Sequence, residues 1–158
     1  MVVQLCADAT VGKLARWLRL LGYDVLEVTG SQDEVAYVAR SQGRMLISRN
    51  HRLAHRPGLR VILVEPTDLA RQVALVIRKV GRLPPGTPPR CMRCNEALVQ
   101  LNPEQAQHRL PSYLLRTQTR FRLCPKCGRI YWRGTHWQAI EDRVARILAS
   151  LSEDVRTP

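Results

Sequence analysis

The sequence has no apolar run near the roughly 20 residues that a membrane-spanning helix requires. It also lacks a signal-peptide pattern, because Met1 leads directly into an apolar segment and then Asp8, with no basic stretch in front. These two absences exclude the usual signs of a membrane or secreted protein. We therefore expect a cytoplasmic protein without a membrane partner.

Lysine and acidic residues are scarce. Lysine occurs only at Lys13, Lys79 and Lys126, and 13 acidic residues face 25 basic ones, for a formal net charge of +12. Nearly all the positive charge is therefore arginine, whose planar guanidinium suits phosphate binding. Genome composition or thermal adaptation can also enrich arginine, but charge this one-sided favours a polyanionic partner.

Strand-like and helix-like segments alternate through the first half of the chain. We predict strands over 2–7, 23–28, 45–47 and 61–64, and helices over 11–22, 33–40 and 69–80, with a short helix or loop over 51–56. This alternation predicts an α/β fold with a parallel sheet and right-handed crossovers. Thr10 can cap the first helix and Gly22 can end it in the left-handed conformation. Asp68 or Thr67 can cap the last.

Polar side chains follow two of these strands where each strand ends. Asp8 follows the first strand, and Ser48, Arg49 and Asn50 follow the third. In an open α/β sheet, sites lie at the carboxyl ends of the strands. These residues are therefore candidates for one polar site, although Asp, Ser and Asn are also ordinary turn and capping residues.

Other charged residues near this site have two interpretations. Asp33 and Glu34 fall in the first turn of the second helix, where the helix dipole already favours carboxylates, so capping competes with function. Lys13 and Arg16 lie near the start of the first helix and are candidates to bind phosphate. Arg19, farther along that helix, is interpreted as part of its solvated face.

Carboxylates held close together repel one another, and a divalent cation relieves that repulsion. Oxygen ligands such as those of Asp8 and Asn50 suit Mg²⁺ or Mn²⁺. In a basic protein the natural substrate is a phosphodiester, which such a metal could help to hydrolyse. In this hypothesis Ser48 orients a ligand or water, Arg49 meets phosphate and Glu34 is auxiliary.

The second half begins after a proline-rich stretch, residues 82–90, which we expect to be a semi-stiff spacer. Two CxxC pairs follow, Cys91/Cys94 and Cys124/Cys127. Four thiolates at this spacing predict a structural Zn²⁺ site. Buried reduced cysteines and a redox CxxC are the less favoured alternatives, because the two pairs are equal and neither opens a thioredoxin-like unit.

Around this predicted zinc site we expect strands over 98–101 and 121–123, an insertion over 103–118 and a closing amphipathic helix over 137–151. Asn95 and Gly128 suit the tight turns after each cysteine pair. Cations mixed with aromatic residues suit single-stranded or structured RNA. The nucleic-acid candidates are Lys13, Arg16, Arg52, Arg120, Arg122, Arg129, Arg133 and Trp132. Trp132 and Trp137 have an equally good interpretation as core residues.

Three parts of the chain resemble one known family. They are the string from Gly12 to Val25, the segment from Gly43 to Asn50 and the Tyr131–Trp137 ending of the second cysteine motif. The family that they resemble is the Mut-seven C-terminal RNase domain family. The resemblance covers nearly the whole chain and implies a PIN-like nuclease domain joined to a zinc ribbon. It places Asp8 and Asp33 at the family's acidic metal positions. Ser48-Arg49-Asn50 matches its Thr-Arg-Asp signature with two departures, the second of which removes a charge.

From these observations we expect a PIN-like α/β domain over 1–81, a linker over 82–90, a zinc ribbon with a C-terminal helix over 91–151 and a frayed tail over 152–158. The leading hypothesis is a metal-dependent ribonuclease. The alternatives are a catalytically weakened or inactive RNA-binding module, marked by Asn50, and an adaptor that contacts a protein or ribonucleoprotein.

Overall fold

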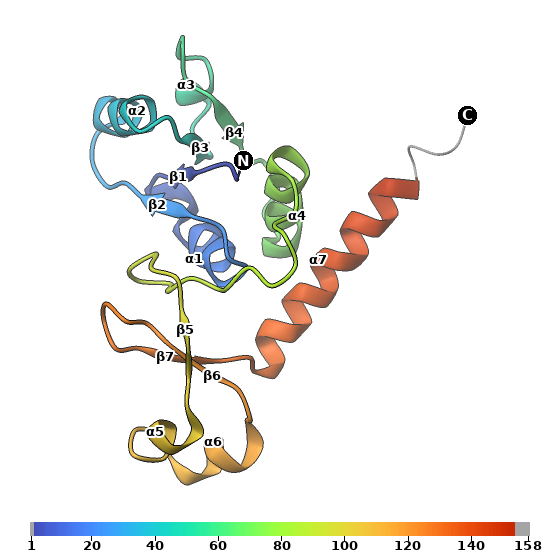
Figure 1. Ribbon diagram of the computed structural model, residues 1–158. Helices are drawn as coiled ribbons and strands as arrows, with labels where there is room; N and C mark the ends of the chain where they lie inside the picture. The colour runs from blue at the N-terminus through green and yellow to red at the C-terminus, as the bar shows by residue number, and fades with distance from the viewer. Residues whose placement is uncertain (1, 154–158) are drawn as a thin grey trace.

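The computed structural model describes residues 2–153 and contains two sheets (Figure 1). The first is a four-stranded parallel sheet in the order β2-β1-β3-β4. Its strands are β1 (Leu5–Ala7), β2 (Val25–Glu27), β3 (Met45–Ser48) and β4 (Val61–Leu63). The predicted parallel α/β architecture is confirmed. β1, β2 and β4 are shorter than predicted, whereas β3 extends one residue farther, to Ser48.

Helices cover both faces of this sheet because successive strand residues point to opposite sides. Leu5 and Ala7 join one apolar cluster with residues of α1 (Gly12–Leu20) and α4 (Leu69–Val80). Cys6 points the other way, into a cluster with α2 (Gln32–Ser41) and α3 (His51–Ala54). The central strands are thus buried from both sides, and polar side chains gather only where strands end.

The start of α1 differs from the prediction. Asp8, not Thr10, provides the cap, by accepting a hydrogen bond from the Thr10 backbone at the start of a short 3-10 turn, η1 (Ala9–Val11). Thr10 lies inside that turn. Gly22 does follow α1 with a positive φ of 101°, and Asp68 does cap α4. The Asp8 carboxylate therefore organises the strand-to-helix turn.

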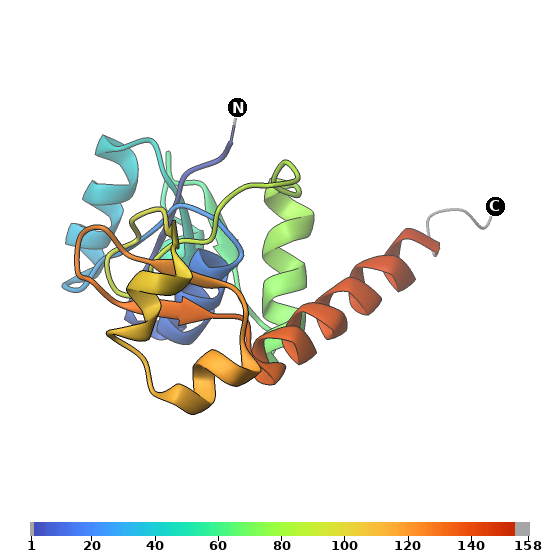
Figure 2. The same ribbon diagram turned by 60° about the horizontal axis from the view of Figure 1, so that its bottom comes forward.

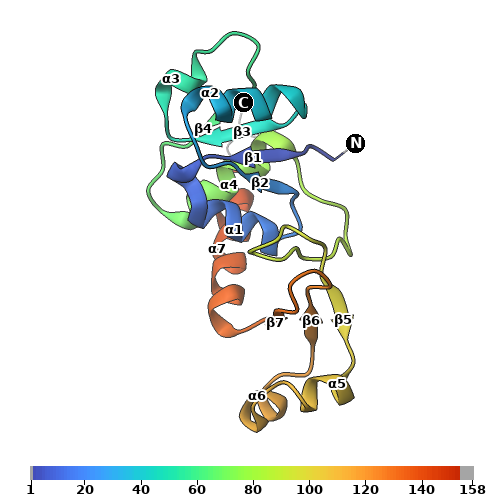
Figure 3. The same cartoon turned by 90° about the vertical axis from the view of Figure 1, so that its left-hand side faces the viewer.

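The second half contains a three-stranded antiparallel sheet (Figure 3). Its strands are β5 (Val99–Leu101), β6 (Phe121–Leu123) and β7 (Ile130–Trp132). The predicted insertion forms two short helices, α5 (Pro103–Gln107) and α6 (Ser112–Thr117), at the end of this sheet farthest from the parallel sheet.

The last helix, α7 (Thr135–Glu153), returns to the first half and lies against α4 (Figure 2). Ile140, Val144 and Leu148 join the apolar cluster of the parallel sheet, so this helix completes the core of the N-terminal half. Residues 152 and 153, predicted to be frayed, belong to α7, and 154–158 of the predicted tail lie outside the described residues.

The stretch 82–90, predicted as a semi-stiff spacer, runs beside the end of α1, where Leu83, Thr87 and Pro88 lie close to Gly22. The Arg90 backbone amide donates to the Arg19 carbonyl at 2.7 Å, and the Tyr23 hydroxyl donates to the Gly81 carbonyl. Within residues 2–153, no helix combines the length and the apolar character needed to cross a bilayer.

Candidate nucleic-acid interface and metal centre

The carboxyl ends of β1 and β3 meet, as predicted, at a site that we call the Asp8 edge (Asp8, Ser48 and Asn50). The two strands pair in parallel, and the Ser48 hydroxyl donates to the Asp8 carboxylate. The same Ser48 oxygen accepts from the Asn50 backbone amide at 2.9 Å. Thr10 completes the network, because its hydroxyl donates to Asp8 and accepts from the Arg49 amide at 3.0 Å.

The Asp8 carboxylate is almost buried, with 8% of the residue exposed, and is surrounded by donors from Ser48 and Thr10. The Asn50 side-chain oxygen accepts from the Arg52 amide and caps α3. The Arg49 guanidinium turns toward the exit of β4, where it donates to the Pro66 carbonyl at 3.0 Å. Each of these side chains therefore has at least one local partner.

Asp33 and Glu34 are held at the start of α2. Asp33 forms an ion pair with Arg56 at 2.6 Å, and its side chain is 84% exposed. Glu34 forms a capping box with Ser31, and the amide and hydroxyl of Ser31 lower the pKa of the Glu34 carboxyl. Among the described contacts, none connects either acid with Asp8. The contacts of Glu34 therefore agree with the helix-capping interpretation.

Four cysteines form the one group of three or more His, Cys, Asp or Glu side chains, among the described residues, that could hold a metal ion. The Sγ atoms of Cys91, Cys94, Cys124 and Cys127 lie within 4.8 Å of one another, and we call this group the cysteine site. Sulfur donors in this number and closeness suit tetrahedral Zn²⁺. The acids near Asp8 form no comparable group within residues 2–153.

The two CxxC turns are shaped for metal binding by local backbone geometry. Asn95 and Gly128, the residues predicted for these turns, have φ values of 61° and 74°. Their amides donate to the carbonyls of Cys91 and Cys124, each at 2.9 Å. These turns bring the two cysteine pairs face to face.

Tyr131 supports the cysteine site from β7, a role that the sequence did not predict. Its hydroxyl accepts from the Met92 amide at 3.1 Å, which leaves its own proton to donate to the Cys91 sulfur, also at 3.1 Å. Burial alone would raise the pKa of the Cys91 thiol, but bonds from Tyr131 and from the Cys94 and Arg93 amides lower it to about 6. A thiolate is the form that binds a metal.

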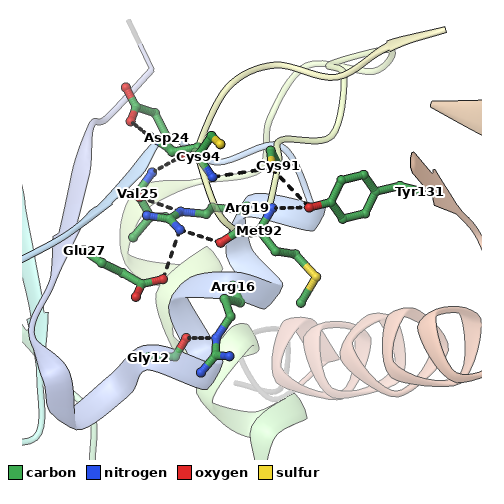
Figure 4. A network of polar contacts seen from close by, with 11 residues as sticks. Gly12, Arg16, Arg19, Asp24, Val25, Glu27, Cys91, Met92, Cys94 and Tyr131 are labelled. Atoms are coloured by element: carbon green, nitrogen blue, oxygen red, sulfur yellow. Dashed lines mark hydrogen bonds and ion pairs between the residues drawn. The ribbon is translucent and has the colours of Figure 1, made fainter. Parts of the chain in front are cut away.

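The sequence interpretation of Arg19 as a solvated residue was wrong. Arg19 is 4% exposed, and its guanidinium joins the two halves of the chain (Figure 4). It donates to the Val25 carbonyl at 2.8 Å, to Glu27 at 3.0 Å and to the Met92 carbonyl at 2.6 Å. Burial lowers the pKa of this guanidinium, an effect that Glu27 opposes. The partner Met92 lies 73 residues away in sequence, which explains why no local pattern revealed it.

A second connection lies beside Arg19. The Asn95 side chain donates to Asp24 at 2.6 Å and accepts from the Val25 amide at 3.1 Å. Asp24 also pairs with Arg44 at 2.9 Å. The first cysteine turn is thus bonded to Arg19 of α1 through the Met92 carbonyl, and to the edge of the parallel sheet through the Asn95 side chain.

Four of the predicted nucleic-acid residues line one hollow of about 300 Å³ beside β7 and α7. We call it the aromatic pocket, and those four are Arg120, Arg122, Arg133 and Trp132. Trp137 also lines it, and its Nε1 is buried without a hydrogen-bond partner among the described residues. Arg133 pairs with Glu141 across the pocket wall.

The remaining predicted nucleic-acid residues are distributed elsewhere. Lys13 and Arg52 are exposed near the Asp8 edge, because α1 and α3 both begin there. Arg16 and Arg129 line a different hollow, between α1 and the first cysteine turn. The structure therefore divides the predicted set into groups instead of gathering it on one surface.

Comparison with known proteins gives one result. The family model described as Mut7-C RNAse domain matches residues 3–144, which includes both the parallel sheet and the cysteine site. Searches of curated proteins and of solved structures found no match. Since the match covers most of the chain, the chain belongs to the Mut7-C RNAse domain family.

Proposed function

We propose that this protein is a ribonuclease that cleaves RNA phosphodiester bonds at the Asp8 edge. Its membership of the Mut7-C RNAse domain family is the single observation that carries the proposal. The carboxylate at the end of β1, bonded to Ser48 at the end of β3, supports this location, because open α/β sheets place their sites there.

The donors at this edge agree in type with a hard cation. Oxygen atoms of Asp8 and Asn50 at this edge, together with Asp33 once it leaves its ion pair with Arg56, would hold Mg²⁺ or Mn²⁺. The cation would supply positive charge for the scissile phosphate and a more acidic water. The chain itself surrounds the Asp8 carboxylate with hydroxyl and amide donors. Ser48 fixes the orientation of that carboxylate, and exposed Lys13 and Arg52 offer charge to the substrate backbone.

The cysteine site has a separate role in this proposal. Zn²⁺ held by four thiolates has no open position, so it stabilises the second half and does not take part in the reaction. The aromatic pocket beside it combines guanidinium groups with two tryptophans, a pattern that suits the phosphates and bases of single-stranded RNA. Binding and cleavage would thus use different parts of one molecule.

The direct test is cleavage of labelled single-stranded RNA with Mg²⁺, Mn²⁺ or a chelator. Asp8→Asn should lower the rate on the order of 10²-fold or more, as for groups that act at the reacting atoms. Glu104→Gln, an exposed acid on α5, is the matched control and should cleave as the wild type does. Equal cleavage by wild type and Asp8→Asn, with both folded by circular dichroism, would overturn the location.

Asn50→Asp sharpens the same test. If the missing charge limits metal binding at this edge, the added carboxylate should raise the Mn²⁺-dependent rate and lower the Mn²⁺ concentration that gives half of it. Asn50 caps α3 through its side-chain oxygen, and Asp supplies an equivalent cap. A changed rate would therefore report charge and not loss of the helix.

A second candidate function is RNA binding without cleavage. The ion pair of Asp33 with Arg56, together with the neutral Asn50, favours it, because both reduce the free negative charge available to a cation. Tight, salt-sensitive RNA binding with no cleavage in any metal would select this alternative and overturn the ribonuclease proposal.

A further inference from the structure

A hollow of about 610 Å³ lies between α1, β2 and the first cysteine turn. Four arginines line it, and we call it the arginine pocket: Arg16 and Arg19 from α1, Arg93 from the cysteine turn and Arg129 from the turn before β7. Neither half of the chain forms this pocket alone, since each contributes two of the four guanidinium groups.

The charge of the arginine pocket is not balanced by protein groups. Glu27 is the one carboxylate in its lining, and it already pairs with Arg19 at 3.0 Å. The exposed side chains of Arg93 and Arg129 have no hydrogen bond or ion pair among the described contacts. The one described side-chain bond of Arg16 goes to the Gly12 carbonyl. Several guanidinium groups therefore face one space with donors to spare.

Arg19 makes this pocket more than a collection of surface arginines. Its side chain is only 5% exposed, and its Nε and Nη1 atoms hold the partners described above (Figure 4). Its Nη2 atom has no partner among the described contacts. This atom is also absent from the buried polar atoms that lack a partner, so it is accessible to solvent. A fixed, mostly buried guanidinium thus lines the pocket, with one nitrogen that has no partner among the described contacts.

We propose that the arginine pocket binds the phosphate backbone of the RNA strand. Arginine forks match phosphate geometry in paired hydrogen bonds, and a pocket with four cations and one neutralised acid has the charge that a polyanion requires. The proposal rests on the proposed function and names where the strand is held. It also explains why Arg19 is buried, because this residue lines the pocket while its hydrogen bonds join the two halves.

The position of α1 relates this pocket to the Asp8 edge. The helix begins at Gly12, immediately after the turn capped by Asp8, and Arg16 lies about one turn farther along it. A strand bound in the pocket and following α1 toward its N-terminus reaches the Asp8 edge. The pocket is then an anchoring site that orients the substrate, separate from the place of cleavage.

The neighbouring cysteine site offers another role for these arginines. Four thiolates around Zn²⁺ leave a net negative centre, which nearby guanidinium groups would stabilise. The two roles differ in what a substitution changes. Loss of a phosphate contact weakens RNA binding and its salt dependence, whereas loss of a counter-charge for the thiolates weakens zinc binding.

The test measures binding of a short fluorescein-labelled oligouridylate by fluorescence anisotropy over a range of KCl concentrations. All proteins carry Asp8→Asn, so that cleavage does not disturb the measurement. Arg93→Gln with Arg129→Gln should bind about tenfold more weakly, with a salt slope shallower by about 1.4, since each phosphate contact on single strands contributes about 0.7. Arg71→Gln with Arg78→Gln removes the same charge from exposed positions on α4 and should change little.

Zinc content and circular dichroism are measured on the same samples. Arg16→Gln is a further variant, distant in sequence from the cysteines, and it should weaken binding with zinc retained. Three outcomes would each overturn the proposal. The first is an equal loss of binding in the Arg71/Arg78 control, and the second is unchanged binding in both pocket variants. The third is weaker binding that appears only where zinc is lost. Cleavage is assayed separately in the protein that keeps Asp8. If that protein binds RNA through the arginine pocket but does not cut it, the ribonuclease proposal is refuted and the pocket proposal stands.

Discussion

The two halves of this chain are stabilised in different ways. The parallel sheet is buried on both faces and shares a continuous apolar cluster with α1, α4 and α7. Among the described residues before α7, the second half has two small clusters, one around Leu98 and two cysteines and another around Leu101, Ala106 and Phe121. A segment with so little apolar core needs another source of stability, which a metal at the cysteine site would supply.

The comparison also shows how a weakly packed segment can be held in place. Arg19 and Asn95 bond the first cysteine turn to α1 and to the edge of the parallel sheet. These are polar contacts with defined geometry, and they fix orientation where apolar packing is thin. The arginine pocket lies at this junction, so its shape depends on both halves.

The largest expected effect is loss of the metal. Cys124→Ser, or a strong chelator, should unfold the second half, because zinc binding contributes about 10 kcal/mol in small structural sites. Limited proteolysis should then cut within residues 91–134 while the parallel sheet persists, and zinc content should fall. Cys6→Ala, which removes a buried cysteine outside the cysteine site, should keep its zinc. A protease-resistant second half in Cys124→Ser would refute the comparison.

A cavity in the core of the first half should lower the stability of that half and leave the zinc content unchanged. Leu14→Ala removes a fully buried side chain of α1 and should lower the free energy of unfolding by about 3 kcal/mol. Zinc content should stay unchanged. Tyr37→Ala, at a position 71% exposed on α2, is the control and should change stability by less than about 0.5 kcal/mol. Denaturant titration measures both.

Arg19→Met tests the junction between the halves. Methionine keeps much of the volume but leaves the Met92 carbonyl and Glu27 without their donor. Because Glu27 is partly solvated, we expect a loss of only about 2 kcal/mol. Unfolding followed by tryptophan fluorescence and by protease sensitivity of the second half should separate into two transitions. A single coincident transition would show that the halves are joined by other contacts.

The smallest expected effect is at Asp24, and it depends on pH. Burial by itself would raise the pKa of this carboxyl, but hydrogen bonds from Arg44 and Asn95 outweigh burial and lower it. Its stabilising contribution is therefore present above the unfolded pKa of about 3.9 and is lost as the pH falls through the lower folded value. Asp24→Asn should cost about 1 kcal/mol at neutral pH. Thermal melts should show this gap close in acid, and a constant gap would contradict the assignment.

Local patterns predicted the elements of this fold well. The alternation of apolar segments predicted the parallel sheet, and the two CxxC pairs with Asn95 and Gly128 predicted the cysteine site, because each depends on neighbours in sequence. The docking of α7 on α4 could not be predicted, since an amphipathic face does not name its partner. The same limit explains why the burial of Arg19 was not predicted, since its partner Met92 lies in a turn 73 residues away.

The candidate site was predictable in part. The meeting of Asp8 with Ser48 follows from the carboxyl ends of adjacent parallel strands, and the structure has it. Asp33 and Glu34 carried two interpretations from the start, and their contacts with Arg56 and Ser31 depend on side-chain positions that no sequence pattern encodes. Their part in catalysis stays a prediction for the cleavage assay.

The return of α7 to the first half affects the order in which the protein can fold during synthesis. Ile140, Val144 and Leu148 cover α4, but the ribosome makes them after the entire cysteine-bearing segment. The N-terminal core therefore stays open on one side while that segment emerges. Translation thus finishes the first half last, and a nascent chain stalled before residue 135 exposes an apolar strip along α4 to chaperones and proteases.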